Sequence, residues 1–187
     1  IPLRLVGSEM CIRDRVGYIP QRSGISIDIS VLDVVMMGFN PRLGLLERPG
    51  RKMQDLAAQA LEQVGLGGRE QSNYLCLSEG QKQLCILART LVSGSRLLLL
   101  DEPVSGIDQN GMELFYKTMD YLKTHYDLAI ILISHDLDYV AKYADHVVLL
   151  DKTVAKQGTV KEVFESKEFE RIFYTGDESW VREEEHK

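Results

Sequence analysis

The strongest constraint on the fold is a run of four leucines, Leu97 to Leu100, followed directly by Asp101 and Glu102. An uninterrupted apolar run of this length is typical of a central strand of a parallel sheet that is buried on both faces. The two acids then stand at the carboxyl end of the strand, where open α/β sheets bind ligands. An Asp-Glu pair after a strand is by itself an ordinary solvated turn, so the surrounding motifs must decide its meaning.

Those motifs follow one another in a recognisable order. The run Ser78-Glu79-Gly80-Gln81 resembles the signature motif of ATP-binding-cassette (ABC) ATPases, with Glu79 where the usual pattern has glycine. Leu97 to Glu102 resembles their Walker B strand. The Q-loop, D-loop and switch histidine of the family are matched in turn by Tyr18-Ile19-Pro20-Gln21, Ser105-Gly106-Ile107-Asp108 and Ser134-His135-Asp136. The resemblance covers residues 16–164 and implies an α/β fold of the P-loop NTPase type: a mostly parallel sheet flanked by helices, with a helical subdomain inserted at about residues 28–92.

Apolar spacing predicts the helices of that subdomain. Ser30 to Asp33 has the pattern of a capping box that opens a helix, and Asn40-Pro41 is expected to end it. A second helix, closed by Gly65, has an apolar stripe at a spacing of three and four residues: Met53, Leu56, Ala57, Ala60, Leu61 and Val64. A third helix should begin at Ser78 and bury Leu84, Leu87, Ala88 and Leu91.

The carboxyl half predicts a strand, a helix and a strand that form a parallel crossover. Met112, Phe115, Met119 and Leu122 mark the helix, and residues 129–133 form the second strand. Residues 147–150 and 154–155 are expected to form a hairpin, and Thr159 to Glu162 a second capping box. We expect residues 165–187 to form a carboxyl-terminal helix and a charged tail, frayed beyond Gly176.

The composition and net charge of the chain argue against several classes of protein. At 187 residues, with 44% hydrophobic and 27% charged residues, the chain has the size and composition of one soluble domain. A net charge of −6 argues against a nucleic-acid footprint, and no apolar stretch reaches the roughly 20 residues of a membrane span. Cys11, Cys76 and Cys85 show no metal-binding spacing and suggest a reducing cytoplasm.

The phosphate loop of the family, Gly-x-x-x-x-Gly-Lys-Ser/Thr, does not occur in the sequence. Residues 1–15 do not resemble the family but do resemble a translated sequencing-adapter read-through. We therefore expect residues 1–15 to be foreign and residues 16–164 to be a partial ABC ATPase domain without the phosphate-loop strand and helix. Such a chain is expected to be inactive alone.

The resemblance gives each acidic-site residue a role. Glu102 orients and deprotonates the attacking water, since phosphoryl transfer needs a placed base more than covalent chemistry. Asp101 holds Mg²⁺ through its water shell, and Gln21 reaches the same ion and the water. His135 senses the γ-phosphate.

The signature residues face a second subunit. Ser78 caps a helix, and by family analogy Ser78, Glu79, Gly80 and Gln81 meet the γ-phosphate of ATP bound to the opposite protomer. This implies a head-to-tail dimer that sandwiches two ATP molecules, with Asp108 bridging the subunits. The charge of Glu79 near the phosphate is unfavourable for tight binding.

The resemblance therefore predicts the ATPase subunit of a bacterial importer, peripheral on the inner face of the cell membrane. Its partners are membrane permease subunits and, indirectly, an extracytoplasmic substrate-binding protein. The carboxyl half resembles zinc and manganese importers more closely, whereas residues 31–48 and 78–91 resemble ferric-siderophore and cobalamin importers. A non-transport relative acting in DNA repair or translation and an inactive fragment are the other readings.

Overall fold

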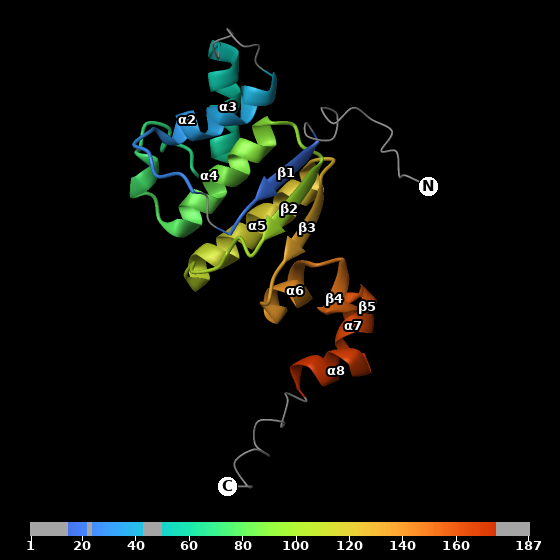
Figure 1. Cartoon of the computed structure of the whole chain (residues 1–187). Coiled ribbons are helices and arrows are strands. Elements are labelled where there is room, and N and C mark those ends of the chain that lie inside the picture. The colour runs from blue at the N-terminus through green and yellow to red at the C-terminus, as the bar shows by residue number, and fades with distance from the viewer. Residues whose placement is uncertain (1–14, 22–23, 43–49, 175–187) are drawn as a thin grey trace, which may run out of the picture. The chain divides into compact units, whose positions relative to one another are not determined.

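The computed structural model describes residues 15–21, 24–42 and 50–174 (Figure 1). The chain divides between His135 and Asp136 into two compact units. The expectations for the first fourteen residues and for the tail beyond Gly176 fall outside the described residues.

The first unit is built on a three-stranded parallel sheet in the order β1-β2-β3. Its strands are β1 (Val16–Ile19), β2 (Leu97–Asp101) and β3 (Ala129–Ile133). The register places Ile19 beside Leu100 and Asp101 beside Ile133. The leucine run is thus the central strand, as predicted, and the fold is of the α/β class.

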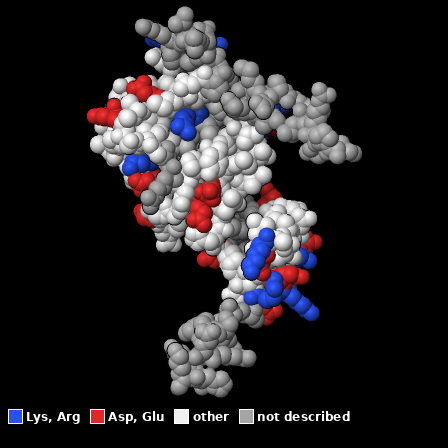
Figure 2. Space-filling view, viewed as in Figure 1, with Lys and Arg blue, Asp and Glu red and all other residues white. Residues whose placement is uncertain are grey.

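The two faces of β2 differ, which corrects the expectation that both are buried. Leu98 and Leu100 are buried, whereas Leu97 and Leu99 are only half-buried. On β3, Ile131 is 56% exposed. In the described part of the chain helices cover one face of the sheet, and Figure 2 shows that the surface over β1 to β3 on the viewed side is largely uncharged.

The helical subdomain consists of α2 (Val31–Met36), η1 (Met37–Arg42), α3 (Arg51–Gln63), η2 (Tyr74–Cys76) and α4 (Glu79–Val92), of which α2, α3 and α4 pack against one another. Ser30 caps α2 by accepting from the Asp33 N–H at 3.0 Å and donates its hydroxyl to the Asp33 carboxylate. The expected end at Asn40-Pro41 is wrong, because a 3₁₀ helix continues to Arg42. Residues 37–42 turn more tightly than α2, with the three residues per turn of a 3₁₀ helix, so the helical segment runs past the proline.

Helix α3 buries four of the six residues of its predicted stripe: Ala57, Ala60, Leu61 and Val64. Leu56 is 43% exposed, which contradicts its place in the stripe. It precedes Ala57 by one residue and so lies about 100° round the helix axis from it, at the edge of the contact with α2 and α4. Gly65 ends the helix as predicted, with a φ of 78° and its N–H donating to the Glu62 carbonyl.

Helix α4 begins after its N-cap Ser78, as predicted, and is buried from Gln83 to Ala88. The burial extends round the helix because α2, α3, β1 and the next helix, α5 (Gln109–His125), all pack on it. Leu91 is only half-buried, contrary to expectation, since it lies in the last turn. On α5 the predicted Phe115, Met119 and Leu122 are buried.

The second unit contains α6 (Leu137–Tyr143), β4 (His146–Asp151), β5 (Thr153–Thr159), α7 (Val160–Phe164) and α8 (Lys167–Phe173). β4 and β5 form the predicted antiparallel hairpin. Thr159 and Glu162 form the predicted capping box at the start of α7, and Leu149, Val163 and Phe169 form a small core. Among the helices that the structure describes, none has the length and apolar character needed to cross a bilayer.

Candidate functional site

Glu102 occupies a sharp turn at the carboxyl end of β2. Its φ of 43° places it in the left-handed region, which a side chain other than glycine rarely adopts. Two backbone hydrogen bonds hold it there: its N–H donates to the Ile133 carbonyl at 3.0 Å, and its carbonyl accepts from the Ser105 N–H at 3.1 Å. The turn is thereby tied to β3, and the carboxylate is presented at the sheet edge.

His135 meets that carboxylate from the neighbouring strand. It follows β3 by two residues, and its Nδ1 lies 3.0 Å from Oε1 of Glu102. The histidine side chain is 77% exposed and the glutamate side chain 33% exposed. An acid and a base with access to solvent therefore stand side by side at the ends of adjacent parallel strands.

Gln21, just beyond β1, completes this cluster. Its Nε2 donates to Ser105 Oγ at 3.1 Å and lies 3.4 Å from Oε2 of Glu102. Its backbone carbonyl accepts a hydrogen bond from Gln83 Nε2 on α4 at 3.1 Å. Residues at three strand ends thus meet at Glu102, and α4 contacts Gln21. A carboxylate in such a position is able to accept a proton from a water molecule.

Asp101 lies at the end of β2 with its Oδ2 3.5 Å from the Tyr18 hydroxyl. No group of three or more His, Cys, Asp or Glu side chains in the described residues could hold a metal unaided. Mg²⁺ fits this donor set in another way, because it takes one or two protein oxygens and completes its shell with phosphates and water. Asp101 would supply such an oxygen, and Gln21 would offer its Oε1, since its Nε2 faces Glu102 and Ser105.

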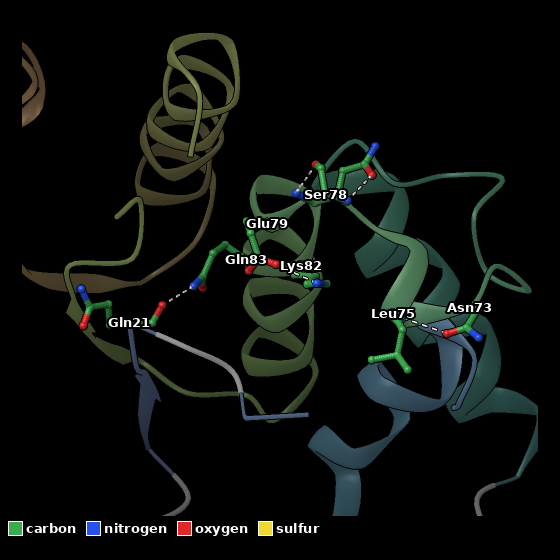
Figure 3. A network of polar contacts seen from close by, with 8 residues as sticks. Gln21, Asn73, Leu75, Ser78, Glu79, Lys82 and Gln83 are labelled. Carbon is green, nitrogen blue, oxygen red and sulfur yellow. Dashed lines mark hydrogen bonds and ion pairs between the residues drawn. The ribbon is translucent and has the colours of Figure 1, made fainter. Parts of the chain in front are cut away.

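The signature residues form the first turn of α4. Ser78 Oγ accepts from the Gln81 N–H at 3.3 Å, and Gln81 Oε1 accepts from the Ser78 N–H at 3.2 Å, which is a reciprocal capping box (Figure 3). Glu79, the residue that departs from the family pattern, pairs with Lys82 Nζ at 2.7 Å. This ion pair offsets the negative charge that Glu79 brings to the helix start.

The D-loop packs on the same helix start. A Cβ at Gly80 would lie 3.2 Å from Ile107 Cγ2, so the absence of a side chain there lets the loop approach α4 closely. Asp108 caps α5 by accepting from the Gly111 N–H at 3.2 Å. Its role in bridging two subunits stays a prediction.

Glu102, His135 and Gln21 are thus brought together as their expected shared chemistry requires, while Ser78 to Gln81 form a separate group at the start of α4. Three further residues contact the candidate site residues but received no role from the sequence: Ser105, Lys82 and Gln83. Lys82 follows Glu79 at a helical spacing of three, and that signal alone could have found it. Gln83 and Ser105 act on Gln21 from 62 and 84 positions away, which spacing along one helix cannot show.

Comparison with known proteins identifies the relatives of this chain. The ABC transporter family profile matches residues 7–105, just over half of the 187 residues. The manganese transport system ATP-binding protein MntB of Listeria monocytogenes is 37% identical over 154 residues, which cover 81% of this chain and 64% of that protein. The zinc transport system ATP-binding protein TroB of Treponema pallidum is 36% identical over 163 residues, covering 86% of this chain and 61% of that one.

Solved structures agree on the fold. An ABC transporter assigned to the metal-chelate type, in an inward-facing conformation, matches with a TM-score of 0.80 at 28% identity over 85% of this chain and 64% of that one. The cbiO1 protein of Clostridium perfringens, part of the cbiONQ transporter complex, matches with a TM-score of 0.74 at 28% identity, over 94% of this chain and 69% of that one. The chain spans less than two thirds of the length of the curated relatives named here.

Proposed function

Because this chain belongs to the ABC transporter family, we propose that it acts in the ATP-hydrolysing subunit of a bacterial importer whose cargo is zinc or manganese. The observation that carries the hydrolytic part is the Glu102 cluster, in which a carboxylate, a histidine and a glutamine meet at the ends of three parallel strands. The manganese and zinc transport ATPases among the relatives support the cargo.

In this proposal Glu102 takes the proton of the attacking water, and Gln21 orients that water through its amide. His135 holds the Glu102 carboxylate through Nδ1 and turns the rest of its exposed ring toward the γ-phosphate. Mg²⁺, held by Asp101 and Gln21, neutralises charge on the phosphate oxygens when it is bound.

The signature residues complete the site of a second protomer. Two chains pair head to tail, and the first turn of α4 in one chain faces the γ-phosphate bound by the other. Free N–H groups and the positive end of the helix dipole favour an anion there, and the Ser78 hydroxyl adds a polar contact. ATP-driven closure of this dimer is transmitted to permease subunits that hold the protein at the inner face of the membrane, with a substrate-binding protein outside.

A test of the cargo starts from deletion of the whole reading frame that contains this chain in its host. We expect slower growth under divalent-metal chelation and rescue by added zinc or manganese. A matched control is the same deletion complemented by the Glu102→Gln variant, which should not rescue. Normal growth of the deletion strain under zinc and manganese limitation would contradict the cargo assignment.

A second candidate cargo is a metal chelate, namely a ferric siderophore or cobalamin. It is favoured by the fold match to a transporter assigned to the metal-chelate type. In that case the deletion strain would take up less labelled ferric chelate or vitamin and would grow normally on chelated zinc. The two uptake measurements therefore separate the candidates, while the hydrolytic proposal is common to both.

A further inference from the structure

Gln83 is a polar side chain in the most deeply buried part of α4. Its exposed fraction is 6%, and the five residues that follow it, Leu84 to Ala88, are each between 0% and 2% exposed. A buried amide needs hydrogen-bond partners, since burial without them costs about 1–3 kcal/mol. Its contacts therefore indicate why an amide stands at this position.

The Gln83 amide reaches out of the helix to a single backbone group. Its Nε2 donates to the Gln21 carbonyl at 3.1 Å. Figure 3 draws this hydrogen bond as a dashed line between the two residues. On the other side of that residue, the Gln21 side chain contacts Glu102 and Ser105. One hydrogen bond thus connects α4, whose first turn carries Ser78, to the residue that contacts the proposed base.

The same amide is only half satisfied. Gln83 Oε1 is buried and has no hydrogen-bond partner within the described residues. Rotating the amide would not help, because its oxygen would then face the oxygen of the Gln21 carbonyl. Among the described residues, the bond to Gln21 is therefore formed together with an acceptor that has no partner, an arrangement that net stability does not favour.

We propose that Gln83 is a positioning residue for ATP hydrolysis, whose amide fixes the Gln21 backbone so that the Gln21 side chain meets Glu102. This inference rests on the proposed function. It also gives a route by which the placement of α4, and hence of the signature turn, reaches the hydrolytic cluster.

The test uses the whole reading frame that contains this chain and compares wild type with Gln83→Met. Methionine keeps the length of the side chain and removes both the donor and the unsatisfied acceptor. We expect kcat to fall about three- to tenfold, the factor that one hydrogen bond supports. The KM for ATP should stay constant and the melting temperature should be unchanged or higher.

Thr90→Val is the matched control. Thr90 is equally buried on α4, but among the described residues its hydroxyl donates to carbonyls of its own helix, those of Ile86 and Leu87. This variant should lower the melting temperature slightly and leave kcat unchanged. A purely structural role for Gln83 would produce that same pattern in Gln83→Met and would overturn the proposal.

A double variant tests the route through Gln21. In a Gln21→Ala background no side chain remains to be positioned, so adding Gln83→Met should cause no further loss of kcat. A further loss of the same size as in wild type would contradict the proposal.

A spectroscopic measurement separates this inference from the proposed function. The side-chain amide signal of Gln21 in ¹⁵N-labelled protein, assigned by its loss in Gln21→Ala, should shift in Gln83→Met and stay in place in Thr90→Val. An unmoved signal overturns the positioning role even if hydrolysis is normal. If the wild type hydrolysed no ATP, the proposed function would be contradicted. The shift of the Gln21 signal in Gln83→Met would still report the contact between the two residues.

Discussion

Nδ1 of His135 lies 3.0 Å from Oε1 of Glu102, although the two residues are 33 positions apart in the sequence. The contact exists because β2 and β3 are adjacent and parallel, so that the residues after each strand leave the sheet at the same edge. A base and its partner are thus placed by the register of two strands.

Glu102→Gln should abolish ATP turnover in the whole reading frame and leave ATP binding intact, because the amide cannot take a proton from water. The trapped state should appear as an ATP-dependent dimer in size-exclusion chromatography. Glu113→Gln is the control, since Glu113 pairs with Lys117 along α5 and has no role in the proposed hydrolysis. An active Glu102→Gln variant, or one that stays monomeric with ATP, would show that the base is misassigned.

The ring of His135 should report on Glu102 directly. In Glu102→Gln the ¹⁵N chemical shifts of the His135 ring should move, because the charged acceptor 3.0 Å from Nδ1 is replaced by a neutral amide. His125 provides an internal control, since its Nδ1 lies 2.8 Å from the Tyr121 carbonyl. Identical shifts for His135 in both proteins would exclude the contact in solution.

Gly38→Ala should destabilise the helical subdomain. An added Cβ would clash with the Arg89 carbonyl oxygen, so η1 and α4 would have to separate at a cost of about 1–3 kcal/mol. Gly67→Ala is the matched control, because its added Cβ would make only ordinary van der Waals contacts, the nearest at 3.6 Å from Glu62 Cα, and it should change stability by at most about 0.5 kcal/mol. Urea unfolding measures both, and equal midpoints would contradict this close approach.

Cys85 should resist alkylation in the folded protein. Burial raises the pKa of its thiol from 9.0 to about 12, and the nearby charge of Arg89 only partly opposes this. The thiolate is the reactive form, so iodoacetamide at pH 8 should label the exposed Cys76 and spare Cys85, as peptide mass spectrometry would show. Labelling of both at equal rates would refute the burial.

The same thiol predicts a pH dependence of stability. Its folded pKa lies above its unfolded value, so its contribution is fully present below pH 9 and is lost as the pH rises toward about 12. Cys85→Ala should weaken this alkaline loss relative to wild type. Equal alkaline slopes of the two unfolding free energies would contradict the assignment.

Lys82→Met should weaken ATP-driven dimer formation in the whole reading frame, because it leaves the Glu79 charge without its partner 2.7 Å away. The effect should be small, about two- to fivefold in the dimer dissociation constant, since exposed ion pairs contribute at most about 1 kcal/mol. Glu79→Gly combined with Lys82→Met should restore wild-type affinity. A loss that persists in the double variant would mean that Lys82 acts independently of Glu79.

The sequence predicts much of the local structure correctly. Caps such as Ser78 and Thr159 are set by hydrogen bonds within three residues, so their patterns can be read directly. Errors occur where packing between elements determines which side chains are buried. Leu56 has the right spacing but lies beyond the contact of α3 with its neighbours, and Leu97 and Leu99 face a side of the sheet that the described helices leave open.

In the candidate site, too, local patterns could be predicted from the sequence and long-range contacts could not. Glu102 and His135 follow apolar strands and carry recognisable motifs, so they could be predicted. Gln83 could not, because its partner Gln21 lies 62 positions away and on a different type of element. Its sequence signal was faint: a glutamine directly before the apolar run Leu84 to Ala88 of a predicted helix.

The left-handed backbone at Glu102 has a practical consequence for protein engineering. With a φ of 43°, this position favours glycine, which adopts such conformations without steric cost. A screen that selects only for heat resistance would therefore select Glu102→Gly, a variant that lacks the proposed general base. Libraries built on this scaffold need an activity filter at that codon, because selection for robustness and selection for turnover favour different residues there.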